Sequence, residues 1–274
     1  MAEQSASWVY AVVPRARATV GSLTGVAGEP VRVVRHRDIC AVVGSVPARE
    51  VDERALRRHL SDPGWLERTV RRHHDVVAAL FRTAPTVPFR LVTVYRDDQR
   101  VLDMLQRRHA ELVDALVTVT GRAEWGVQVV AVPPPVPGET GAGTGGESGG
   151  ETGGGTGGET GTAERPGTSY LLRRRAEGQA RDAARRNATD AALVVHRALE
   201  RLAAAHRQAP PRRPPAGPEG RMVLNACYLV DDHRRDRFTR AIRQVIGRQP
   251  ELRLRITGPW PAYSFVEIGK DAES

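Results

Sequence analysis

Residues 222–268, MVLNACYLVDDHRRDRFTRAIRQVIGRQPELRLRITGPWPAYSFVEI, decide the fold of the second half of the chain. Apolar, β-branched runs predict strands over residues 222–230, 251–257 and 263–268. An amphipathic helix is predicted after the first strand, with Asp231 or Asp232 as its cap and Gly247 at its end. The inward positions of that helix are Phe238, Ile242 and Val245.

A long helix is predicted before this stretch, over residues 169–206. Small and aliphatic residues recur along one side of it at helical spacing: Leu172, Ala176, Ala180, Ala184, Ala188, Ala191, Val195, Leu199 and Leu202. Alanine favours the helix, and a face of small residues can pack closely against a sheet. Together, the strands and helices predict a ferredoxin-like α+β domain over residues 168–270.

A glycine-rich segment, residues 133–167, separates this domain from the rest of the chain. It begins PPPVPGETGAGTGGESGG, and 13 of the 27 glycines of the chain lie within its residues 138–161. Because it offers nothing apolar to bury, it is predicted to be a disordered, flexible linker. Its glycines do not follow a strand and open a helix, so they do not make a dinucleotide-binding fingerprint.

The first half, residues 1–132, is predicted to be an α+β domain. Arg37 and Asp38 join two β-branched runs into a hairpin candidate. One helix is predicted after Asp62 and Pro63, with an inner face that includes Val70 and His73, and a second helix is capped by Asp97 or Asp98. The predicted strands cover residues 7–13, 31–36, 39–46, 89–95 and 125–132.

Composition excludes several classes of protein. The net charge is +9, from 41 Lys+Arg against 32 Asp+Glu, and Lys270 is the only lysine. A P-loop and Schiff-base chemistry both need a lysine that this chain does not place suitably. Cys40 and Cys227 are too few for a disulfide scaffold and are predicted to be buried thiols in a reducing cytoplasm. Neither a membrane span nor a signal peptide is predicted.

The residues that could carry chemistry form no catalytic constellation. His73 and His74 are adjacent, so they do not share a helix face, and His73 is predicted to be a satisfied core histidine. Ser264 has no nucleophile-elbow motif, and Cys227 has no visible histidine partner. We therefore expect no enzyme activity, no cofactor and no metal.

Arginines in the first half of the long helix raise the alternative of a nucleic-acid-binding regulator that uses this helix, residues 169–206. They are Arg173, Arg174, Arg175, Arg181, Arg185 and Arg186. Glu177 and Asp182 interrupt them, and aromatic residues that could stack on bases make up only 5% of the chain. A solvated helix face is the favoured interpretation, and nucleic acid is not expected as a partner.

The sequence GPWPAYSFV, residues 258–266, predicts a rigid corner because two prolines flank Trp260. Tyr263 and Phe265 follow closely and concentrate the few aromatic residues. Either Trp260 packs on the core, or the corner presents an aromatic side chain to a partner protein.

The same nonapeptide resembles the C-terminal signature of the gas vesicle protein F/L family. Further segments are similar to that family in the same order: WVYAVV (8–13), DICAVVGSV (38–46), HHDVV (73–77), VPFR (87–90), EWGVQV (124–129) and NACYLV (225–230). The chain departs from the family pattern at Leu91 and Val92, where Phe-Gly is usual, and at Ala262, where proline is frequent.

The resemblance implies a non-enzymatic gas vesicle accessory or minor structural protein, found in the cytoplasm and at the gas vesicle. Such a protein would bind the small hydrophobic shell protein and other accessory proteins, and would assist vesicle assembly. It also implies an α+β N-terminal domain and a modified ferredoxin-like C-terminal domain. Arg90, Trp260 and Tyr263 are the candidate partner-binding residues.

Overall fold

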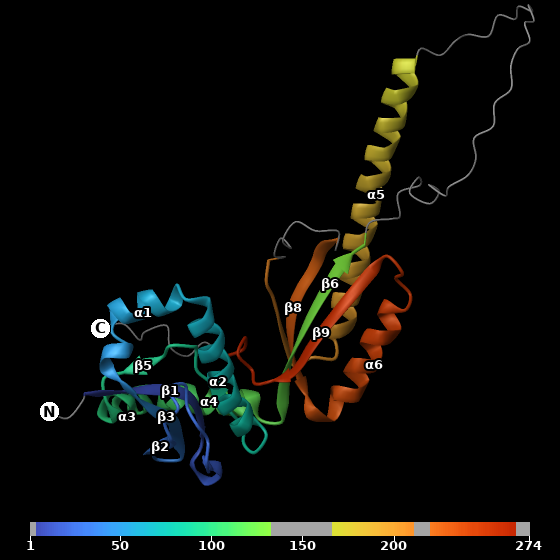
Figure 1. Cartoon of the computed structure of the whole chain (residues 1–274). Helices are drawn as coiled ribbons and strands as arrows, with labels where there is room; N and C mark the ends of the chain where they lie inside the picture. The colour runs from blue at the N-terminus through green and yellow to red at the C-terminus, as the bar shows by residue number, and fades with distance from the viewer. Residues whose placement is uncertain (1–3, 133–165, 211–219, 267–274) are drawn as a thin grey trace, which may run out of the picture.

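The computed structural model describes residues 4–132, 166–210 and 220–266. Two lobes make up the fold, and one long helix, α5, projects from the second of them (Figure 1). Both lobes combine an antiparallel sheet with helices, so the predicted α+β class is confirmed. Within these ranges no helix has both the length and the apolar character needed to cross a bilayer. Most of the predicted linker lies outside the described residues.

The sheet of the first lobe is built around its first strand. Its strands are β1 (Ser5–Pro14), β2 (Val31–His36), β3 (Ile39–Pro47), β4 (Val87–Pro88) and β5 (Val94–Tyr95). The order is β2-β3-β1-β4, and β5 also pairs with β1. The predicted hairpin is confirmed, with Arg37 at φ +50° in the turn between β2 and β3.

The strand predicted over residues 89–95 is wrong, because a turn separates β4 from β5. Val92 adopts a left-handed conformation with φ +65°, which no strand contains. The Thr93 hydroxyl donates to the Arg90 carbonyl oxygen at 2.9 Å and closes that turn.

Helices cover both faces of this sheet. They are α1 (Glu53–Leu60), α2 (Pro63–Phe81), α3 (Asp98–Arg107) and α4 (His109–Val119), with short 3-10 turns η1 (Arg15–Arg17) and η2 (Ala48–Glu50). The predicted caps are confirmed: Asp62 accepts a hydrogen bond from the Gly64 backbone, and Asp97 accepts one from Arg100. The second predicted helix is in fact two, α3 and α4, which part at Arg108.

The two faces of β1 belong to two different cores. Trp8 and Tyr10 pack with Val77 of α2 on one face. Val9 packs with Leu105 of α3 on the other. Because both faces are covered, β1 is buried along almost its whole length, as a nearly continuous apolar run would require.

The second lobe is a four-stranded sheet backed by two helices. Its elements are β6 (Arg122–Ala131), α5 (Pro166–Glu200), β7 (Ala205–Gln208), β8 (Arg221–Asp231), η3 (Asp232–Arg234), α6 (Arg235–Ile246) and β9 (Leu252–Trp260). The strand order is β7-β8-β6-β9 and every neighbouring pair is antiparallel. This connectivity, β-α-β-β-α-β, is the split β-α-β arrangement.

The strand β6 corrects the predicted domain boundary at residue 132. It lies in the middle of the second sheet, where it pairs with β8 from Arg122↔Asp231 onward and with β9 on its other side. The first lobe therefore ends near Gly121, at the start of β6. Strand pairing of this kind joins residues that are far apart in the sequence, so local pattern does not reveal it.

Two details of the second lobe also differ from the prediction. The long helix stops at Glu200, and the residues that follow its last turn form the edge strand β7. Asp231 does not cap α6 but holds Arg122 in an ion pair at 2.9 Å, and Arg234 takes the position before the helix. Gly247 ends α6 as predicted.

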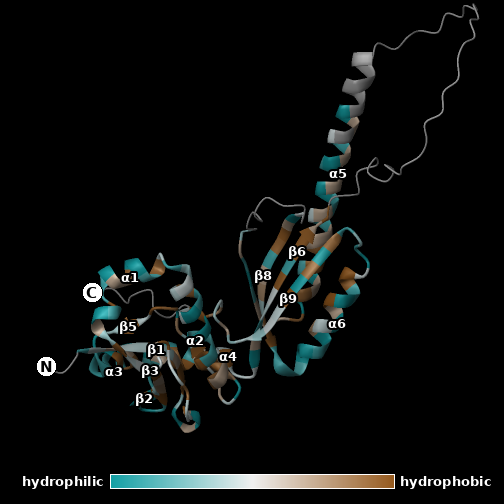
Figure 2. Ribbon diagram, viewed as in Figure 1, coloured by the Kyte–Doolittle hydropathy of each residue, from teal (hydrophilic) through white to brown (hydrophobic). Residues whose placement is uncertain are grey.

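The helix α5 has two unlike halves (Figure 2). Its second half packs on the sheet through Ala188, Ala191, Ala192, Val195 and Leu199. In its first half Ala176 and Ala180, which were predicted to face inward, are exposed. Because this half extends past the end of the sheet, its small residues have no sheet beneath them (Figure 1).

Candidate partner-binding site at the lobe junction

The last described residues, 258–266, lead the chain from β9 back to the first lobe, and we call them the return segment. They contain no strand after Trp260, so the strand predicted over residues 263–268 is wrong within the described part of it. Instead, Ala262 and Val266 are buried in the core that α3 and α4 form with the first sheet. The segment is therefore a connection between the two lobes.

Glu124, at the start of β6, anchors the return segment. Its side chain is buried, with 6% of the residue exposed, and both of its oxygens accept hydrogen bonds from Ser264. The Ser264 backbone N–H donates at 2.7 Å and its hydroxyl at 2.6 Å. Bonds to a charged acceptor each contribute about 1.5–3 kcal/mol. Through these two bonds Ser264 attaches the return segment to its anchor, Glu124.

Gly258 permits the close approach between the return segment and β6. Its φ is +120°, and a Cβ there would lie 2.7 Å from the Glu124 carbonyl oxygen. A side chain would therefore push β9 away from β6 at the point where the return segment begins. The Gly-Pro-Trp sequence lies at the end of β9 and not between two strands.

Trp260 and Tyr263 enclose His74, which projects from α2. The His74 ring makes an edge contact with Trp260 at 5.1 Å between centroids and a tilted contact with Tyr263 at 6.2 Å. We call these three residues the junction cluster. Trp260 remains 40% exposed and Tyr263 36%, so both rings still face solvent.

His73 faces the opposite way and confirms the prediction of a core histidine. Trp8 Nε1 donates to His73 Nδ1 at 3.1 Å, and His73 Nε2 donates to the Phe89 carbonyl oxygen at 3.2 Å. Burial lowers the pKa of His73 to about 4, so its ring is neutral at pH 7. Of the two adjacent histidines, His73 therefore lies in the core and His74 at the junction.

Arg90 does not join the junction cluster. It is exposed in the turn between β4 and β5. Among the described residues its side chain makes no hydrogen bond, ion pair or ring contact with Trp260 or Tyr263. Its link to the cluster is indirect. Phe89, which precedes Arg90, is hydrogen-bonded to His73, and His73 precedes His74 of the cluster.

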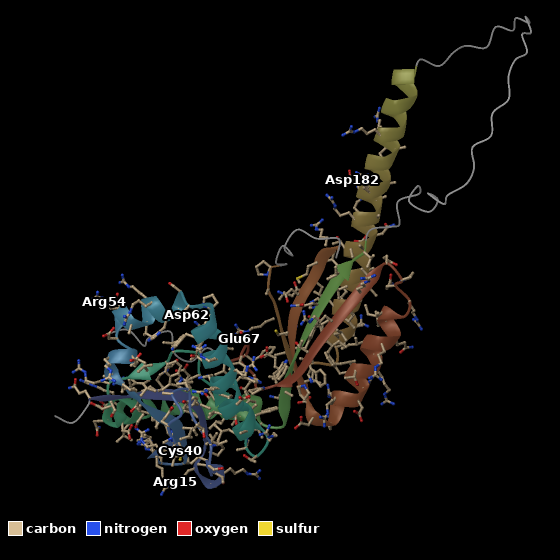
Figure 3. All side chains as sticks on the ribbon, viewed as in Figure 1. Arg15, Cys40, Arg54, Asp62, Glu67 and Asp182 are labelled. Carbon is tan, nitrogen blue, oxygen red and sulfur yellow. The ribbon has the colours of Figure 1, made fainter. Side chains whose placement is uncertain are left out.

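A groove of about 730 Å³ lies at the far end of the second lobe, where α5 leaves the sheet. Arg181 and Arg185 of α5 line it together with Arg221 and Glu251. Asp182 lies on the same projecting half of the helix (Figure 3). The arginines described there, Arg174, Arg175, Arg181, Arg185 and Arg186, are exposed, as a solvated helix face would be.

One group of side chains within the described ranges could hold a metal ion. His196, Glu200 and His206 bring their ligand atoms within 4.8 Å of one another. Burial and the nearby His206 lower the pKa of His196, which favours its neutral ring. The pattern His-x3-Glu on one helix was a usable sequence signal, but the long helix was predicted to run through His206, which hid the third residue.

The junction offers exposed aromatic rings on a fixed backbone, an arrangement suited to binding a protein surface.

Comparison with known proteins places nearly the whole chain in one family. The family profile described as "Gas vesicle synthesis protein GvpL/GvpF" matches residues 6–267. Gas vesicle protein L of Streptomyces sp. (strain CB03234) is 36% identical over 250 residues, which cover 90% of this chain and 87% of that protein. Gas vesicle protein F of the same organism is 27% identical over 276 residues, covering 95% and 99%.

A solved structure shows the same fold. The crystal structure of the gas vesicle protein GvpF from Anabaena sp. PCC7120 superposes with a TM-score of 0.63 at 15% identity, and the match covers 97% of each chain. From the profile and the relatives, this chain belongs to the GvpL/GvpF family of gas vesicle synthesis proteins.

Proposed function

We propose that this chain assists gas vesicle assembly by binding the small hydrophobic shell protein, and that the junction cluster is part of the contact. A role related to gas vesicles follows from the family. The observation that carries the finer proposal is the pair of exposed rings of Trp260 and Tyr263, held in place by a buried carboxylate.

The chemistry of the partner explains why exposed aromatic rings would be suited to binding it. A small hydrophobic shell subunit exposes apolar surface and strand edges before it assembles, and both promote aggregation. Trp and Tyr bury a large area on contact and lose little side-chain entropy, so they are frequent among residues that dominate binding energy.

In the part of the chain that the structure describes, β9 is an edge strand, and it leads directly to this cluster. β9 is the last strand of its sheet, and it ends at Trp260. Arg253 and Arg255 are exposed along it and alternate with half-buried Leu254 and Ile256. A strand of the shell protein could pair with this edge and place an apolar side chain against Trp260. The two arginines would discourage pairing between copies of this chain.

Arg90 completes the proposed contact from the first lobe. It is exposed, and it follows the residue that His73 holds. A cation at this place suits a polar rim around an aromatic centre. Other gas vesicle accessory proteins are further proposed partners, and the proposed location is the cytoplasm, at the growing vesicle.

Co-expression with the shell protein tests the proposal. The double variant Trp260→Ala/Tyr263→Ala should weaken capture of the shell protein about thirtyfold, as loss of about 2 kcal/mol of contact energy would. Val117→Ala is the matched control, since Val117 is an exposed apolar residue of α4, 69% exposed. Unchanged capture by the double variant, or no capture by the unmodified chain, would overturn the proposal.

A further inference from the structure

The end of α5 gathers three metal-ligating side chains that the proposed function does not use. His196 and Glu200 are four residues apart on α5, so they lie on one face of the helix. The helix ends at Glu200, and β7 begins at Ala205. The chain therefore reverses within a few residues, and His206 returns to the level of the last turn of the helix.

Hydrogen bonds fix this reversal. The Leu202 N–H donates to the Leu199 carbonyl oxygen at 3.0 Å, and the Ala204 N–H donates to that of Leu229 at 2.8 Å. β7 then pairs with β8 so that His206 lies opposite Tyr228. Residues opposite each other in an antiparallel pair place their side chains on the same face. His206 is thereby directed to the face on which α5 packs.

The ligand atoms of the three residues already lie within 4.8 Å of one another. His206 Nδ1 and Glu200 Oε1 are 3.6 Å apart. Around a tetrahedral Zn²⁺ with bonds of about 2.0–2.2 Å, neighbouring ligand atoms are about 3.3–3.6 Å apart. The side chains of His206 and Glu200 are 36% and 46% exposed, so small rotations of both close the remaining gap.

Tyr228 orients the third ligand. The His196 Nδ1 and the Tyr228 hydroxyl are 2.7 Å apart, and both residues are buried. When Nδ1 donates to the hydroxyl oxygen, the lone pair of His196 lies on Nε2. Ligating histidines in metal sites commonly use the other ring nitrogen in this way.

We propose that His196, Glu200 and His206 bind a divalent transition-metal ion such as Zn²⁺, with Tyr228 as a positioning residue. Two imidazoles and one carboxylate favour Zn²⁺ over Mg²⁺ or Ca²⁺, which prefer all-oxygen sites. The ion would join the end of α5 to the edge strand β7. Because Ala205 packs on the core of the first lobe, the ion would also stiffen the lobe junction.

The test is calorimetric titration of the full-length, tag-free chain with Zn²⁺, with Co²⁺ absorption as a second reading. The wild-type chain should bind one Zn²⁺, and Co²⁺ should give the visible bands of a four-coordinate N/O site. His206→Ala, which changes an exposed side chain, should weaken Zn²⁺ binding at least a hundredfold, and Tyr228→Phe about tenfold. The control His233→Ala removes an exposed histidine outside the site and should leave binding unchanged.

Three results would overturn the proposal. They are no Zn²⁺ binding by the wild-type chain at micromolar concentrations, equal binding by wild type and His206→Ala, and loss of binding in His233→Ala. Circular dichroism of each variant without metal shows whether it is folded, and Glu200→Gln gives an independent reading on an exposed ligand.

Discussion

The return segment and the projecting half of α5 both carry exposed side chains, but the two regions are built in opposite ways. Glu124 and Gly258 hold the backbone of the nine-residue return segment against β6, beside its two exposed rings. The first half of α5 is longer and rich in arginine, and the side chains described there from Arg174 to Asp182 are exposed. Under the proposed function, exposure would serve recognition at the junction and solvation on the helix.

Removing the anchor should give the largest effect. Glu124→Ala leaves two donors of Ser264 without their acceptor, and we expect the free energy of unfolding in urea to fall by about 4 kcal/mol. Glu67→Ala is the control, because the Glu67–Arg71 pair on α2 is exposed and should contribute less than about 0.5 kcal/mol. Equal losses in the two variants would show that the return segment is not held by Glu124.

Acid should weaken the region beneath the junction cluster. The pKa of His73 is about 4 in the fold, below its value of 6.5 in the unfolded chain, so the unfolded chain takes up a proton first as the pH falls. Stability that is complete above pH 6.5 should therefore decline by about 3 kcal/mol by pH 4.

Urea unfolding at pH 7 and pH 4 measures this decline. His73→Gln should remove most of the pH dependence that His73 causes, whereas His74→Gln should leave it in place. If His73→Gln and the unmodified chain lose stability in parallel between these pH values, His73 is not the group responsible.

A pair of glycine substitutions compares the two regions directly. Gly258→Ala should cost about 2 kcal/mol, because its φ is +120° and the added Cβ meets backbone at 2.7 Å. Gly178→Ala in α5 meets nothing within 4 Å and should add helix stability of about 0.5–1 kcal/mol. Thermal unfolding followed by circular dichroism should shift in opposite directions, and shifts of the same sign would contradict the comparison.

Neutralising the arginines of α5 should have the smallest effect. In Arg175→Ala/Arg181→Ala/Arg185→Ala we expect stability to change by less than about 0.5 kcal/mol and capture of the shell protein to stay the same. An electrophoretic shift assay at physiological salt checks the alternative of a nucleic-acid-binding regulator. A shift by the unmodified chain that the triple variant loses would favour that alternative.

Much of this fold could be predicted from local sequence patterns. Asp62 and Asp97 cap helices as their positions in the sequence indicate, and the hairpin around Arg37 needs only its two residues and its flanking strands. These features depend on neighbours in the chain, so one sequence is enough to find them.

Long-range pairing accounts for the largest of the errors, the placement of β6. β6 lies between β8 and β9, and the sequence of residues 122–131 does not indicate which strands it pairs with. β7 follows α5 so closely that its few residues continue the helical pattern. At the junction, the sequence indicated Trp260 and Tyr263, but Glu124 and His74 could be added only from the structure.

Because both strands that pair with β6 in the described part of the chain lie after residue 166, a cut between β6 and that residue would separate it from both partners. A single cleavage between Val132 and Pro166 would leave β6 on one fragment and both of its partner strands on the other. Each fragment would carry half of the hydrogen bonds that the other needs, and the return segment would add a second point of attachment. The two fragments are therefore suited to a complementation experiment, in which their association would be the measured quantity.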